Sequence, residues 1–216
     1  LALERHEMLK NELKGVKATK RENDEATTTI IEITDDVAAK KLGKAIGKYI
    51  TLEMNSFSDE PTVSDGRLKA LIESIKELLP EGDGVVLVAG VGNESITSDA
   101  LGPMTASNIF ATRHINDELR KYAGFNEKLR PVAAVSTGVL GKTGIESSEY
   151  IKSICESIHP ECVITIDALA AGSVKRLGTT VQMSDTGIAP GSGIGNTRKR
   201  IDEAFIGVPV IAIGIP

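Results

Sequence analysis

The sequence predicts an α/β protein, built as a three-layer sandwich around a mostly parallel central sheet with a small N-terminal β element. Two observations lead to this fold class. From residue 84 onward, strand-like runs that are apolar throughout alternate with helical runs, which is typical of a parallel sheet covered on both faces. Before residue 64, the β-branched runs "TTTIIEI" (27–33) and "KYITLEM" (48–54) alternate in polarity, which indicates half-exposed strands.

Local patterns place the remaining elements in order. A helix is expected to start near Ser64, and an amphipathic helix around Ser98. The other expected elements are strands over 84–90, 131–138, 162–168, 179–185 and 208–215, and a helix over 146–159 with its cap near Ser147. The first 25 residues are expected to be helical, with 14–27 as the most flexible connection.

We expect one domain over residues 1–216, because 216 residues with 41% hydrophobic content can bury a full core. Within this domain we distinguish three parts. These are a flexible charged N-terminal segment (1–26), an outlying β element (27–63) and the α/β core (64–216).

Composition and charge exclude several classes of protein. The net charge is −5 and the basic residues are scattered, so nothing marks a surface for nucleic acid or an anionic membrane. No apolar run approaches the roughly 20 residues that cross a bilayer, and the charged start does not resemble a signal peptide. Cys155 and Cys162 lack redox or zinc-ligand spacing, so we expect reduced structural thiols. Together these features predict a cytoplasmic protein with no nucleic-acid or membrane partner.

Three aspartates stand in loops that follow predicted core strands, namely Asp99, Asp167 and Asp185. In an open parallel sheet, ligand and catalytic groups collect at the carboxyl ends of the strands, where these loops converge. A structural interpretation exists for two of them, because Asp99 could cap a helix and Asp185 could form a turn. Asp167 interrupts an apolar strand and is followed by small apolar residues, so it must be paired, protonated or exposed in a cleft.

Other loop residues are candidates for binding a substrate. The run "PGSGIGN" lacks the spacing of a P-loop or a dinucleotide fingerprint, yet its backbone N–H groups could bind a peptide carbonyl or an anion. We assign the following residues to substrate binding: Asn93, Lys142, Asp185, Gly191 and Gly193.

Four stretches carry a family resemblance. They are "GVGNESITSDALGP", "RPVAAVSTGVLGKTGIESSEYI", "VITIDALAAGSVKRLGTTVQMSDTGIAPGSGIGNTRKR" and "GVPVIAIGIP". The chain closely resembles the spore germination protease family, densely from about residue 84 and more weakly in "KKLGKAIGKYITLE" and "LALE". In two respects it departs from the family. Members generally continue well past "GIP", and Ala189 stands where many have a histidine.

The resemblance implies an endopeptidase that degrades small acid-soluble DNA-binding spore proteins during germination, in the spore core. It also implies a zymogen that is autoprocessed, an active homotetramer, and a fold similar to that of the hydrogenase maturation proteases. The start at "LALE" resembles that of a processed form. The two key aspartates of the family match Asp99 and Asp167.

The residues themselves suggest how two carboxyls could hydrolyse a peptide bond. If Asp99 and Asp167 lie close together, they share one proton, and one serves as base while the other serves as acid. The helix after Asp99 slightly favours Asp99 as the base. This mechanism needs no cofactor and no metal.

Three alternatives stay open. A metal-assisted peptidase would need a third oxygen from Asn93, Glu94 or Asp185. A non-catalytic nucleotide-binding, Rossmann-like module would bind phosphate in its glycine loops. A serine nucleophile is disfavoured, because no Gly-x-Ser-x-Gly motif is present.

Overall fold

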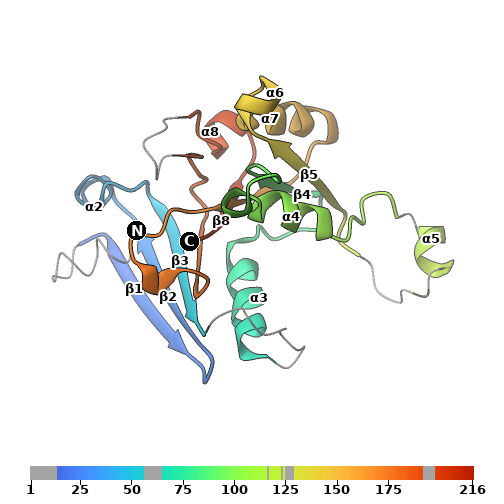
Figure 1. The fold of residues 1–216 in the computed structure, drawn as a ribbon. Helices are drawn as coiled ribbons and strands as arrows, with labels where there is room; N and C mark the ends of the chain where they lie inside the picture. The colour runs from blue at the N-terminus through green and yellow to red at the C-terminus, as the bar shows by residue number, and fades with distance from the viewer. Residues whose placement is uncertain (1–13, 56–64, 116, 123, 125–128, 192–197) are drawn as a thin grey trace. The chain divides into compact units, whose positions relative to one another are not determined.

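The protein divides into two compact units, which Figure 1 shows as ribbons. The structure is a computed structural model that describes residues 14–55, 65–115, 117–122, 124, 129–191 and 198–216. The first unit comprises Leu1–Leu79, Leu169–Thr186 and Ala212–Pro216, and the second unit comprises Pro80–Ala168 and Gly187–Ile211. Each unit is therefore assembled from separate stretches of the chain, whereas the three parts that we distinguished in the sequence are each one continuous stretch.

The first unit is built on an antiparallel sheet. Its strands are β1 (Val16–Glu22), β2 (Ala26–Ile33), β3 (Gly47–Met54) and β7 (Thr180–Ser184), paired in that order. Three residues of β8 (Val210–Ile215) extend it, with Gln182 opposite Gly214 and Ser184 opposite Ala212. Figure 1 shows β1, β2 and β3 side by side. β2 alternates buried and half-buried residues as the sequence pattern predicts, except that Ile30 and Ile31 are both buried.

The expectation of a helical first 25 residues and a flexible 14–27 is wrong for the described part, because β1 and the start of β2 lie there. A turn joins the two strands, since the Asn23 side chain accepts the N–H groups of Glu25 and Ala26 at 2.9 and 2.7 Å. β1 is an edge strand whose side chains are exposed after Val16. An edge strand rich in charge carries little apolar periodicity, and the sequence pattern therefore did not reveal it.

Helices of the first unit begin at aspartate caps. α2 (Asp36–Leu42) lies between β2 and β3, and Asp35 accepts the Ala38 N–H at 2.8 Å. Leu42 of this helix packs with Ile31 and Ile33 in a small core. α3 (Gly66–Leu78) is capped by Asp65, whereas the expected cap Ser64 lies outside the described residues. The 3₁₀ turn η2 (Val174–Arg176) completes the unit.

The second unit contains the parallel part of the fold. β4 (Val86–Val91) pairs in parallel with both β5 (Val132–Gly138) and β6 (Cys162–Ala168). Its helices and 3₁₀ turn are η1 (Thr97–Asp99), α4 (Leu101–Asn108), α5 (Asp117–Tyr122), α6 (Leu140–Thr143), α7 (Ser147–Ile158) and α8 (Glu203–Ile206).

Two helices cover opposite faces of β4. Leu87, Ala89 and Val91 pack in one core with Ile151 of α7. The Cβ position of Gly90 is on the opposite face of β4 and lies against α4. This helix–sheet–helix order gives the second unit the three layers that the sequence predicts.

The α/β class is confirmed, and the sheet is mixed: β4 pairs in parallel with β5 and β6, and β6 runs parallel to its other neighbour β8, since the Val163 N–H donates to the Pro209 carbonyl and the Leu169 N–H donates to the Ile215 carbonyl. The reason lies in the connection after β6. No α-helix crosses over there, and after residues 169–179 the chain returns as the antiparallel strand β7.

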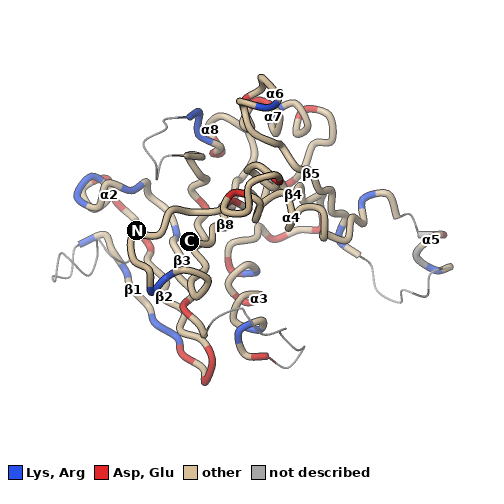
Figure 2. The backbone as a smooth tube through the Cα atoms, viewed as in Figure 1, with Lys and Arg blue, Asp and Glu red and all other residues tan. Residues whose placement is uncertain are grey.

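Cys155 and Cys162 are free and buried, as expected. No helix of the described ranges is long and apolar enough to cross a membrane. Figure 2 shows Lys and Arg on several elements of each unit, α3 and α6 among them.

Candidate active site

Asp167 is a buried carboxyl at the carboxyl end of β6. The six residues Cys162–Asp167 are buried in succession, and Asp167 is only 6% exposed. Burial and, to a smaller extent, the negative charge of Asp99 raise the pKa of Asp167 to about 7, while an N–H bond from Ala168 opposes the change. Asp167 therefore holds its proton to a much higher pH than an exposed aspartate does.

Asp99 is held by the loop between β4 and α4. The Asn93 N–H donates to the Asp99 carboxylate at 2.8 Å and also to the Asp99 carbonyl at 3.0 Å. Gly92 makes this closure possible with a φ of +126°, and a Cβ there would lie 2.1 Å from the Asp99 carbonyl oxygen. The helix-cap interpretation of Asp99 fails, because α4 begins after Ala100 without any side-chain cap.

The second unit brings the two predicted catalytic aspartates together. η1, which ends in Asp99, contacts β6, which carries Asp167. The influence of the Asp99 charge on the pKa of Asp167 follows from this proximity. Two carboxyls, one buried and one held by an N–H bond, form a pair in which one member can keep its proton.

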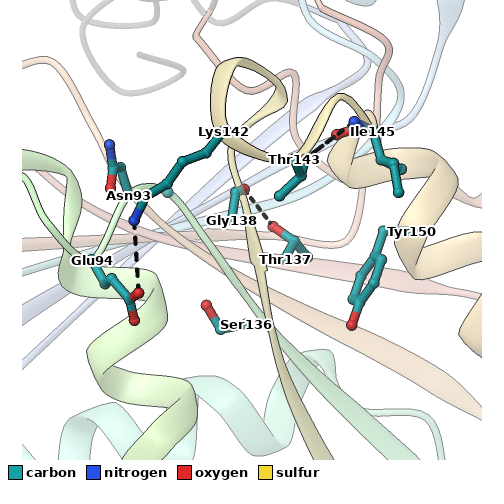
Figure 3. Close-up of a pocket in the computed structure, with 10 residues that line it drawn as sticks. Asn93, Glu94, Ser136, Thr137, Gly138, Lys142, Thr143, Ile145 and Tyr150 are labelled. Atoms are coloured by element: carbon teal, nitrogen blue, oxygen red, sulfur yellow. Dashed lines mark hydrogen bonds and ion pairs between the residues drawn. The ribbon is translucent and has the colours of Figure 1, made fainter.

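A pocket of about 380 Å³ adjoins Asp99. Asn93 lines this pocket while its N–H holds the Asp99 carboxylate. Figure 3 shows Lys142 reaching toward Asn93 and Glu94 across one side of the pocket. The lining residues are Gly92, Asn93, Glu94, Ser136, Thr137, Gly138, Lys142, Thr143, Ile145 and Tyr150. Asn93 and Lys142, both predicted to bind substrate, thus lie at one pocket beside one of the catalytic candidates.

Lys142 holds its place through two partners. Its ammonium donates to the Ser95 hydroxyl at 3.0 Å and lies 3.8 Å from the Glu94 carboxylate. Both charged side chains are more than half exposed, so this ion pair is screened by water and exchangeable. Lys142 can therefore give up Glu94 for an anionic group of a ligand.

The hydroxyls of the pocket differ in how far they are engaged. The Thr137 hydroxyl donates to the Gly138 carbonyl at 3.0 Å and lies within hydrogen-bond distance, 3.2 Å, of the Ser147 hydroxyl, and Thr143 donates to the Ile145 carbonyl at 3.1 Å. Ser136 and Tyr150 line the same pocket, and sequence reasoning did not select either of them for binding. A signal was available for Ser136, since it lies near the carboxyl end of a parallel strand.

The other predicted binding residues are placed differently. Asp185 belongs to the first unit, where its carboxylate accepts the Lys48 N–H at 2.8 Å, and burial raises its pKa. Gly191 belongs to the second unit and has a φ of +71°. Gly193 lies outside the described residues. The structure therefore brings only Asn93 and Lys142 of this set to the pocket.

Possible metal ligands are sparse in the part of the chain that the structure describes. No group of three or more His, Cys, Asp or Glu side chains is placed there to hold an ion. His114 is exposed in a loop, and His159 is the left-handed C-cap of α7.

Comparison with known proteins places this arrangement in a family. The family model described as "Germination protease" matches residues 2–216. A germination protease from Caldanaerobacter subterraneus subsp. tengcongensis is 44% identical over all of this chain, which spans 67% of that relative. Germination proteases from Bacillus mycoides and Bacillus cereus are 39% and 40% identical over all of this chain, which spans 61% of each.

A solved structure is also similar in part. The hydrogenase maturation protease HycI from Thermococcus kodakarensis matches with a TM-score of 0.43 and 17% identity, over 66% of this chain and 79% of that one. The family model and the relatives above, which match along the whole length of this chain, establish that it belongs to the germination protease family.

Proposed function

We propose that the chain is an endopeptidase that starts the degradation of small acid-soluble DNA-binding spore proteins during germination, and that Asp99 and Asp167 activate the attacking water. The single observation that carries the mechanism is the raised pKa of Asp167, about 7, beside the charged Asp99. A carboxyl that keeps its proton at neutral pH is suited to general-acid catalysis.

The two aspartates divide the work by their surroundings. Asp99 accepts an N–H bond, so it stands as the carboxylate that takes a proton from water while the water oxygen bonds to the peptide carbon. Asp167, in its protonated form, gives its proton to the departing amine nitrogen as the C–N bond breaks. Asp99 ends protonated and Asp167 ionised, and proton transfer between the pair restores the starting state.

The pocket beside Asp99 supports a binding role for Asn93 and Lys142. Lys142 is a cation with exchangeable partners, so we assign it to an acidic side chain of the substrate. The further assignments of Asp185, Gly191 and Gly193 to substrate binding remain predictions. The family resemblance supports a homotetramer in the spore core, produced as a zymogen that is autoprocessed.

The test is hydrolysis of a purified small acid-soluble spore protein, with the fragments sized by mass spectrometry. We expect Asp99→Asn and Asp167→Asn each to lower kcat by about 10²–10⁴-fold, the usual contribution of a general acid or base. Asp202→Asn is the matched control, because Asp202 caps α8 in the same unit and asparagine caps a helix equally well. Near-normal turnover in either catalytic variant removes that residue from the mechanism.

The pH profile gives a second readout of the same mechanism. Because Asp167 must be protonated to act as the acid, wild-type kcat/KM should fall about tenfold per pH unit above an apparent pKa of about 7. Activity that survives chelation would argue against the metal-assisted alternative. Strong thermal stabilisation by nucleotides, without hydrolysis, would favour the nucleotide-binding alternative.

A further inference from the structure

The backbone of α4 lies directly on the backbones of β4 and β6. Gly90 of β4 and Gly102 of α4 face each other, and a Cβ on Gly90 would lie 2.1 Å from the Gly102 carbonyl oxygen. A Cβ on Gly102 would lie 2.2 Å from the Val91 carbonyl oxygen and 2.3 Å from that of Ile166. Only glycine fits at either position, because the nearest obstacles at both are backbone atoms.

Glycine is an unfavourable residue for such a place. Within a helix or strand, it costs roughly 0.5–1 kcal/mol relative to alanine. Gly102 lies in the first turn of α4 and Gly90 lies inside β4. The close approach of helix and strands is the structural reason for having glycine at both positions.

This contact lies between the two catalytic candidates. Gly102 follows Asp99 by three residues, and the carbonyl that it meets belongs to Ile166, which directly precedes Asp167. We propose that Gly90 and Gly102 are positioning residues, which set the separation of the Asp99 and Asp167 carboxyls by the closeness of α4 to β4 and β6. The proposal rests on the function proposed above.

The direction of the effect follows from the distances. Ordinary contact of a Cβ begins at 3.4 Å, so alanine at position 102 must push the start of α4 away from both carbonyls by about an ångström. Asp99 then moves away from Asp167, and the end of β6 becomes less covered. Less burial and a more distant like charge both lower the pKa of Asp167.

The experiment compares Gly102→Ala with wild type by two measurements. Carboxyl-carbon NMR should show the pKa of Asp167 lowered by at least about half a unit, and kcat should fall about 100-fold, the cost of a displacement of about 1 Å. Gly141→Ala is the control, because a Cβ on Gly141 meets nothing within 4 Å, and both readouts should equal those of wild type. A folded Gly102→Ala protein with an unchanged Asp167 pKa would overturn the proposal.

A second, milder variant tests the proposal if Gly102→Ala does not fold. Ala106 is 5% exposed and lies one turn further along α4, where its Cβ is 2.9 Å from the Cβ position of Gly90. Ala106→Val should tilt the helix without touching Val91 or Ile166, with a modest loss of stability from overpacking. The Asp167 pKa should fall by a smaller amount in the same direction. An unchanged or raised pKa in this variant contradicts the proposal.

The NMR readout separates this proposal from the proposed function. In Asp99→Asn, the Asp167 pKa should fall, because the like charge is gone, and an unchanged value would overturn the positioning role. If both aspartate variants still hydrolyse the substrate while Gly102→Ala lowers the Asp167 pKa, the positioning role stands and the proposed mechanism fails.

Discussion

Asp167 and Asp185 look alike in the sequence and differ in the structure. Each follows an apolar strand, β6 for Asp167 and β7 for Asp185, and burial is the largest cause that raises the pKa of each. In the first unit, Asp185 accepts the Lys48 N–H at 2.8 Å, and the Lys48 charge favours the ionised form. In the second unit, Asp167 has the negative Asp99 beside it.

The difference shows that burial alone does not mark a catalytic carboxyl. A buried carboxylate with a nearby donor and cation is a structural element, because its charge is compensated within the fold. A buried carboxyl beside a like charge keeps a proton near neutral pH and is available for acid–base chemistry. The neighbour of each aspartate, rather than its strand, therefore distinguishes the two, and we expect the catalytic role to go with the like charge beside Asp167.

The largest expected effect in this comparison comes from the glycine that packs against Asp99. Alanine does not fit at position 92, because its Cβ would lie 2.1 Å from the Asp99 carbonyl oxygen and the φ of +126° is one that alanine rarely adopts. The loop must open and Asp99 must move, so hydrolysis of the spore protein should fall by about 100-fold or more. Steady-state kinetics on the folded variant, checked by circular dichroism, measures the loss.

Gly47→Ala provides the matched variant in the first unit. Its Cβ would lie 2.5 Å from the Asp185 carboxylate at a φ of +148°, so it disturbs Asp185 as Gly92→Ala disturbs Asp99. We expect a lower melting temperature and near wild-type kcat per folded molecule. Equal losses of kcat in the two variants would show that the two aspartates do not differ in role.

The next largest effect is on the free energy of unfolding, which should change in opposite directions when Asp167 and Asp185 are substituted. Asp167→Asn should raise the free energy of unfolding at pH 8 by on the order of 3 kcal/mol, because it removes the cost of a buried ionised carboxylate. Asp185→Ala should lower it by about 1 kcal/mol, since the Lys48 N–H loses its acceptor. Urea denaturation of each variant measures both changes.

The gain in Asp167→Asn should depend on pH in a defined way. The pKa of Asp167 is about 7 in the folded protein, against an ordinary value of 3.8, so the folded state binds more protons between these two pH values. The stability that protonated Asp167 contributes is present below about pH 4 and is lost as the pH rises through 7. The advantage of the variant should therefore be small at pH 4 and complete above pH 7, and a constant advantage would contradict the raised pKa.

The sequence predicted the second unit better than the first for a physical reason. Apolar runs such as β4 and β6 are visible because they are buried on both faces, and the interruption at Asp167 stands out against them. β1 was missed because an exposed edge strand has no apolar pattern.

At the site, the pattern of strand ends pointed to Asp99, Asp167 and Asp185 alike, and the family resemblance singled out Asp99 and Asp167 as the catalytic candidates. The Lys48 N–H that engages Asp185 comes from 137 residues away in the chain, and no local pattern reports such a contact. The pocket residue Tyr150 was missed for the same reason, since it reaches the pocket only when α7 is in place, whereas the place of Ser136 near the end of β5 was a usable signal.

The smallest expected effect compares two lysines of the two units. Lys142→Gln removes the cation at the pocket and should raise KM for an acidic substrate by roughly 3–10-fold, the cost of about 1 kcal/mol of screened charge pairing, with kcat little changed. Lys48→Gln is the same substitution in the first unit, where the lysine is paired with Glu77 at 3.2 Å. It should cost up to about 1 kcal/mol of stability and leave KM unchanged. A substrate peptide with its acidic side chains amidated should bind wild type and Lys142→Gln equally. A difference between the two enzymes that persists with that peptide would mean that Lys142 acts on something other than substrate charge.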